Sequence, residues 1–128
     1  MHLHKDEIPV KIDIPGAVAR QLPDFGIADG PLGAEYFSLA TGADMAPLLE
    51  GLADDACHSE HWGYLISGDV VVSYLDGSEE RVTGGDVFYW PAGHSVRVEL
   101  DAELILFSPQ VEHGAVMDHI LGKVASMT

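Results

Sequence analysis

The chain has 128 residues, the size of one ordinary domain, and 47% of them are apolar, enough for a hydrophobic core. Its net charge of −15 argues against nucleic acid and membrane surfaces as partners, because both are anionic. Cys57 is the only cysteine, which excludes a disulfide within the chain, so we expect a reducing, cytoplasmic location.

The first 33 residues are rich in proline, glycine and aspartate, and only short extended pieces such as 10–14 fit there. The sequence therefore predicts that residues 1–33 form an N-terminal arm, which belongs to the same domain and packs on it or on a partner subunit. Because such an arm can cover exposed sheet edges, we expect a homodimer with this segment at its interface.

Residues 34–110 contain a series of short apolar segments, each closed by a turn signal rich in glycine, proline or aspartate. Short strands at this spacing, without helical periodicity, predict an all-β sandwich or barrel. In the strand after the last turn, Val96, Val98 and Leu100 alternate with charged residues, so these three should face the core. His94 has the same parity and should also point inward.

The C-terminal segment differs from the strands before it. Val116, Ile120 and Val124 recur near helical spacing, which predicts a helix over residues 111–128. On this helix, His113 and His119 are interpreted as surface residues.

Two stretches carry a resemblance to the cupin superfamily. In GGDVFYWPAGH (84–94), Gly85, Pro91 and Gly93 match the glycine, five residues, then Pro-x-Gly of the second cupin motif. The resemblance implies a cupin barrel, also called a double-stranded β-helix or jelly roll, and it implies frequent homodimers.

The first cupin motif is matched at its end, in CHSEHWGYLISG (57–68), where His61 and Gly68 keep the spacing between a metal ligand and a strand-ending glycine. The chain looks most like a group of small single-domain cupins whose activity is undefined.

The metal-ligand set that the resemblance implies is not intact. The position of the final histidine holds Val96, His61 stands in the place of the glutamate, and Cys57 and Asp55 fall where the two histidines of His-x-His would lie. A site with a different composition is therefore expected.

Four donor residues, Cys57, His58, Glu60 and His61, crowd into five positions before the first motif strand. We predict that His58, His61 and His94 bind a divalent transition metal. Imidazole and thiolate suit Zn, Fe, Ni or Cu, and a carboxylate ligand would also admit Mn. If His58 points to solvent, Cys57 or Glu60 replaces it; otherwise Cys57 is interpreted as a small buried apolar residue.

The remaining predicted site residues surround this centre. Glu60 or Tyr64 is predicted to move a proton, and Trp62, Tyr89 and Val96 are predicted to contact a small-molecule ligand in the barrel. For the aromatic residues, the alternative is packing in the core.

Two functions remain open from the sequence. One is a metal-dependent enzyme that acts on a small molecule, with dioxygenase, isomerase or lyase chemistry. The alternative is a non-catalytic ligand-binding or sensor module without metal, which the valine at position 96 favours.

Overall fold

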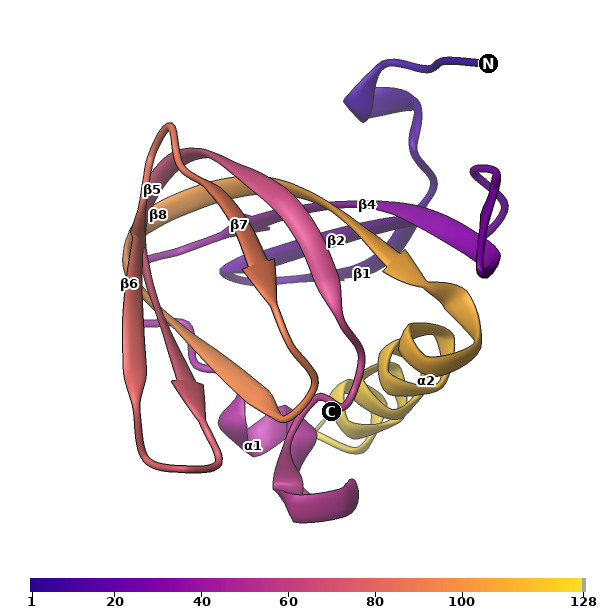
Figure 1. Ribbon diagram of the computed structural model, residues 1–128. Helices are drawn as coiled ribbons and strands as arrows, with labels where there is room; N and C mark the ends of the chain where they lie inside the picture. The colour runs from indigo at the N-terminus through magenta and orange to yellow at the C-terminus, as the bar shows by residue number, and fades with distance from the viewer. Residues whose placement is uncertain (128) are drawn as a thin grey trace.

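The computed structural model describes residues 1–127 and consists mainly of antiparallel strands that curl around an interior, with a long helix at the C-terminal end (Figure 1). The strands are β1 (Val10–Ile14), β2 (Ala17–Leu22), β3 (Ile27–Ala28), β4 (Gly30–Leu39), β5 (His61–Tyr74), β6 (Glu79–Thr83), β7 (Val87–Trp90) and β8 (His94–Pro109). The helices are α1 (Ala46–Leu49) and α2 (Gln110–Ser126), with short 3-10 turns η1 (Lys5–Glu7) and η2 (Ala53–Asp55). The predicted all-β fold with a C-terminal helix is confirmed.

The sheet runs in the order β1-β2-β4-β8-β5-β6, with β3 paired to β4 and β7 paired to β5. The two longest strands, β5 and β8, pair with each other from Trp62 opposite Phe107 to Tyr74 opposite His94. Both strands bend along their length, so that the sheet curves around its core (Figure 1).

The segment predicted as an arm contributes strands to the sheet. β1 and β2 form a hairpin, in which Gly16 has the positive φ of +85° that the tight turn requires. β2 then pairs along its whole length with β4. Residues 10–14 and 17–22 are therefore part of the sheet. Pro9 stands just before β1 and Pro15 lies in the turn after it, where the ladder needs no N–H donor. The homodimer stays a prediction.

The inward face of β8 follows the predicted alternation except at one position. Val98 is buried and Val96 half-buried, but Leu100 is 59% exposed. The pairing of β5 with β8 shifts at this point, since Asp69 lies opposite Leu100 while the next residue, Val70, lies opposite Val98. The prediction for Leu100 is wrong because a β-bulge interrupts the ladder where the strands bend.

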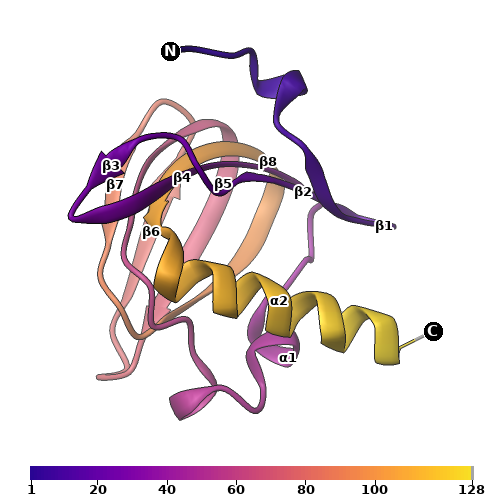
Figure 2. The same ribbon diagram turned by 90° about the vertical axis from the view of Figure 1, so that its right-hand side faces the viewer.

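The helix α2 lies against one end of the curled sheet, beside α1 (Figures 1 and 2). It begins one residue before the predicted start, and its predicted end, residue 128, lies outside the described residues. Val116, Met117 and Ile120 bury its inner face against Ile12 and Leu49. Among residues 1–127, no helix is long and apolar enough to cross a membrane.

Candidate metal centre

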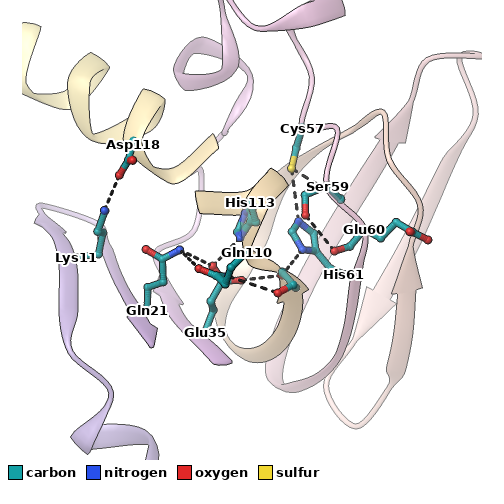
Figure 3. A network of polar contacts seen from close by, with 11 residues as sticks. Lys11, Gln21, Glu35, Cys57, Ser59, Glu60, His61, Gln110, His113 and Asp118 are labelled. Carbon is teal, nitrogen blue, oxygen red and sulfur yellow. Dashed lines mark hydrogen bonds and ion pairs between the residues drawn. The ribbon is translucent and has the colours of Figure 1, made fainter. Parts of the chain in front are cut away.

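Four side chains with metal-binding atoms meet at the end of the barrel that α2 covers. Figure 3 shows three of them, Cys57, His61 and His113. Cys57 comes from the loop before β5, His61 is the first residue of β5, His94 is the first residue of β8, and His113 lies in the first turns of α2. None of the four is more than 5% exposed. We call these residues the Cys-His cluster.

The backbone holds Cys57 next to His94. The Cys57 N–H donates to the His94 carbonyl over 2.9 Å, and the Gly93 N–H donates to the Cys57 carbonyl over 2.8 Å. Gly93 has a φ of +90°, which lets the chain turn sharply after Pro91 and bring the start of β8 to the cysteine loop. On the side facing β5, Cys57 Sγ lies 3.5 Å from Nε2 of His61.

A carboxylate lies beneath the Cys-His cluster. Glu35 of β4 is 0% exposed and accepts three hydrogen bonds: from Ser108 Oγ at 2.7 Å, from Gln21 Nε2 at 3.2 Å and from His113 Nδ1 at 2.6 Å. Gln21 stands opposite Glu35 in the pairing of β2 with β4, and Gln21 also donates to Gln110 at the start of α2 (Figure 3). Each donor faces the carboxylate, as an ionised buried group requires.

These bonds determine which ring nitrogen of each histidine carries a proton. The Ser108 hydroxyl donates to Glu35, so it must accept from Nδ1 of His61, 2.6 Å away. Nδ1 of His113 donates to Glu35, and Nδ1 of His94 donates to the Pro91 carbonyl at 2.7 Å. Every Nδ1–H is thereby used, and Nε2 is the remaining ring nitrogen of each histidine. Histidines that bind metals are held by the same kind of outer hydrogen bond.

The pKa values of Cys57, His61 and His113 are strongly shifted from those of the free side chains. Burial by itself would raise the pKa of the Cys57 thiol, but its hydrogen bonds with His113, His61 and His94 outweigh burial and lower that pKa to about 3. Burial lowers the pKa of His61 to about 4. For His113, burial acts in the same direction, yet the Cys57 thiolate and the Glu35 carboxylate raise its pKa to about 9. The cluster thus favours a thiolate, which is the form that binds metals.

The spacing of the donor atoms suits a metal ion. One ligand atom each of Cys57, His61 and His94 lies within 4.8 Å of the others. In a tetrahedral site with usual metal–sulfur and metal–nitrogen distances, sulfur and nitrogen ligands lie about 3.6 Å apart. The 3.5 Å between Cys57 Sγ and His61 Nε2 meets this value. The donors present therefore fit a transition metal.

A second group of three donors, Glu35, His61 and His113, also lies within 4.8 Å. Its atoms are already joined through protons, because His113 Nδ1 donates directly to Glu35 and His61 Nδ1 reaches Glu35 through Ser108. This group is better explained as the outer hydrogen-bond network that orients the histidines than as a second metal site.

The Cys-His cluster opens into a small cavity of about 70 Å³. Its walls are apolar side chains from β4, β8, α1 and α2, among them Leu39, Val96, Leu104 and Met117. Trp90 also lines it and is 2% exposed. Of the residues predicted to contact a ligand, Val96 is the one that lines this cavity.

The structure excludes His58 from the predicted metal site. The His58 side chain is 40% exposed, and its Nε2 lies 2.8 Å from the Ala53 carbonyl and 3.3 Å from Asp54. His58 precedes His61 by three residues, a spacing that places two side chains on opposite faces of a strand. Cys57, which the sequence offered as a replacement for His58, is buried and lies 3.5 Å from Nε2 of His61.

Four more predicted residues lie outside the barrel. Trp62, Tyr64 and Tyr89 are 44–47% exposed on the outer face of β5 and β7, because each has the opposite parity to His61 or Trp90. Glu60 accepts a hydrogen bond from the Tyr89 hydroxyl. Apart from Tyr64, they line an outer groove of about 650 Å³ that also includes His58. The predictions that these residues act inside the barrel are wrong.

Sequence reasoning missed Glu35, Ser108 and His113. Glu35 shares its parity with Phe37 and Leu39 in a strand whose inner face is apolar, which marks it as an inward carboxylate. His113 precedes Val116 and Met117 by three and four residues, so it lies on the apolar face of α2. The prediction that His113 is a surface residue is therefore wrong. His119 is half-buried, and its Nε2 lies 2.8 Å from the Glu50 carbonyl oxygen.

Comparison with known proteins identifies the fold. No family model matches the sequence, and no curated protein matches it. Among solved structures, oxalate decarboxylase from Bacillus subtilis matches with a TM-score of 0.60 at 21% identity, covering 84% of this chain and 28% of that one. An RmlC-like cupin from Shewanella frigidimarina matches with a TM-score of 0.57 at 21% identity, over 84% of this chain and 88% of that one.

This chain has the cupin fold. Ectoine synthase from P. lautus is a further match, with a TM-score of 0.59 at 15% identity over 85% of this chain and 77% of that one. The chain spans less than a third of the length of the oxalate decarboxylase. At these identities the likeness concerns the cupin fold itself, and the site must be argued from its own residues.

Proposed function

We propose that this cupin-fold protein binds a divalent transition metal through Cys57, His61 and His94, and takes a small-molecule ligand in the adjoining cavity. The observation that carries the proposal is the arrangement of the histidines: each Nδ1–H is held by an outer acceptor, which leaves Nε2 as a ligand atom. His113, whose imidazole hydrogen-bonds the Cys57 thiol, lies beside these three residues.

The donor set favours particular metals. A thiolate with two or three imidazoles suits Zn, Fe, Ni or Cu better than Mn, which prefers oxygen ligands. Oxalate decarboxylase from Bacillus subtilis has Mn(II) centres, but the proposed site here has Glu35 in the outer network and not among the ligands. When bound, the ion would act as a Lewis acid on an oxygen of the ligand or on water.

The groups that could move a proton at this centre belong to the cluster itself. Glu60 and Tyr64 lie outside the barrel, too far from this centre to transfer a proton there. The His113 imidazole lines the cavity and is held by Glu35, which keeps its ring oriented toward Cys57. An enzyme of the dioxygenase, isomerase or lyase type would therefore use His113 for acid–base work.

Metal analysis of untagged protein, purified without nickel, tests the proposal. We expect about one ion per chain in the parent protein, and a large loss of metal in Cys57→Ser, His61→Ala and His94→Ala. His58→Ala is the matched control, since His58 was a candidate ligand but points to solvent, and it should keep the parental metal content.

The opposite outcomes have a clear meaning. Metal-free parent protein, after supply of Zn, Fe, Ni, Cu and Mn, would refute the metal site and favour the binding or sensor module without metal. One observation supports this second candidate: the Cys57 thiol already has hydrogen-bond partners among the imidazoles, so the cluster is satisfied without an ion. Equal metal loss in His58→Ala and His61→Ala would refute the assignment of ligands.

A further inference from the structure

We propose that the cavity beside the Cys-His cluster binds a small uncharged molecule with an apolar body and one lone-pair donor atom, and that it discriminates against carboxylates of the same size. This inference rests on the proposed function in that it takes the same cavity as the ligand site. Three features of the cavity lead to it: the walls, the charge and the size.

The walls offer hydrophobic contact and little else. Apart from the Cys-His cluster and Ser95, the lining consists of apolar side chains such as Phe37, Leu49 and Ile120. A ligand body that fills this space gains by leaving water, whereas a polar body would lose hydrogen bonds without replacement. The lone-pair atom of the ligand belongs at the one polar end, where Cys57 and His94 lie.

The charge of the site gives an anion no partner. Among residues 1–127, none of the six lysine and arginine side chains lines the cavity. The Cys57 thiol and the Glu35 carboxylate already hydrogen-bond the histidines at the polar end, so this end offers a second carboxylate no further partner among the side chains. A buried carboxylate ligand would then lack a compensating charge, which is costly in an apolar cavity. The net charge of −15 also repels an approaching anion.

The cavity volume limits the size of the ligand. A single water needs about 10–15 Å³ of such space, so 70 Å³ holds on the order of five atoms of that size. A four-carbon alcohol or ketone matches this volume. We therefore choose butan-1-ol, butan-2-one and butyrate as probes, because they share a carbon skeleton of similar size and differ in charge.

The fluorescence of Trp90 reports binding directly. The chain has two tryptophans, and Trp62 is exposed on the outer face, so Trp62→Phe leaves Trp90 in the cavity wall as the sole emitter. In this background, loaded with zinc, we expect saturable changes with butan-1-ol and butan-2-one, and binding of butyrate at least roughly tenfold weaker. Butyrate that binds as tightly as butan-1-ol, or no saturable change with either neutral probe, would overturn the inference.

Two variants test whether the change in Trp90 fluorescence comes from binding in the cavity. Val96→Phe places a larger side chain in the cavity wall and should abolish binding of butan-1-ol. Leu100→Phe, on the same strand but 59% exposed, is the matched control and should bind like the parent. If folded Val96→Phe protein binds butan-1-ol as the parent does, the inference is wrong. The comparison of neutral and anionic probes needs neither variant, so it decides the matter even if Val96→Phe does not fold.

The zinc content of the same samples separates this inference from the proposed function. Zinc bound, with butyrate preferred, would refute the inference and leave the metal site intact. No zinc bound, with butan-1-ol still preferred over butyrate, would refute the metal site and uphold the inference, because no lysine or arginine of residues 1–127 lines the cavity, with or without the ion.

Discussion

Removal of the Glu35 carboxylate is the sharpest test of how the Cys-His cluster is built. Leucine at this position has a similar volume but accepts no hydrogen bond, so Glu35→Leu leaves three donors without their acceptor. Two of these keep another partner: Ser108 remains bonded to His61, and Gln21 remains bonded to Gln110. His113 Nδ1, the Ser108 hydroxyl and one N–H of Gln21 each lose the acceptor of their bond to Glu35, and His113 Nδ1 has no other partner.

The expected cost follows from this count. All three hydrogen bonds to the buried carboxylate are lost, each of the kind that contributes about 1.5–3 kcal/mol, while Ser108 and Gln21 each keep one other hydrogen bond. Removing one partner of a buried ionic pair costs about 3–5 kcal/mol in general, and we expect a loss within that range. Since a domain is stable by only about 5–15 kcal/mol, this change removes a large part of the total.

Urea unfolding of metal-free protein measures the effect. With an m-value of about 2 kcal/mol per molar, the midpoint of Glu35→Leu should fall by about 1.5–2.5 M. The control is Glu50→Leu, which removes an exposed carboxylate and should change stability by no more than about 0.5 kcal/mol. A loss below about 1 kcal/mol in Glu35→Leu would refute the view that this carboxylate holds the histidines in place.

Two further predictions concern stability. Burial lowers the pKa of His61 to about 4 from 6.5, so its contribution to stability is complete above pH 6.5 and declines as the pH falls towards 4. In chelator, unfolding free energies measured at pH 6.5 and pH 5 should differ less for His61→Asn than for the parent; equal differences would contradict this. Gly68 and Gly85 both have a φ of +98°, but a Cβ on Gly68 would lie 2.3 Å from the Asp101 carbonyl oxygen, whereas one on Gly85 meets nothing within 4 Å. Melting should therefore show that Gly68→Ala is destabilised well beyond the roughly 1–2 kcal/mol of backbone strain expected for Gly85→Ala, and similar melting temperatures would count against the close approach of β5 and β8.

Much of the fold can be read from local patterns. Alternation places Val98 in the core and His94 on the inward face of β8, because successive side chains of a strand point to opposite faces wherever the chain lies. Helical spacing of Val116 and Ile120 predicts α2 for the same reason. Alternation fails at Leu100, since the bulge between β5 and β8 depends on how two distant segments pair.

The candidate site also has a part that the sequence predicts and a part that only the tertiary structure decides. The sequence predicts that His61 and His94, in two cupin-like motifs, point inward, and both are buried. Both predictions depend only on residues nearby in the chain. The partnership of Glu35 with His113, 78 residues apart, arises only when β4 and α2 close over the end of the barrel. Local sequence determines which way a side chain points; packing of distant elements decides what it meets there, and with that the proton positions and the charge of the Cys-His cluster.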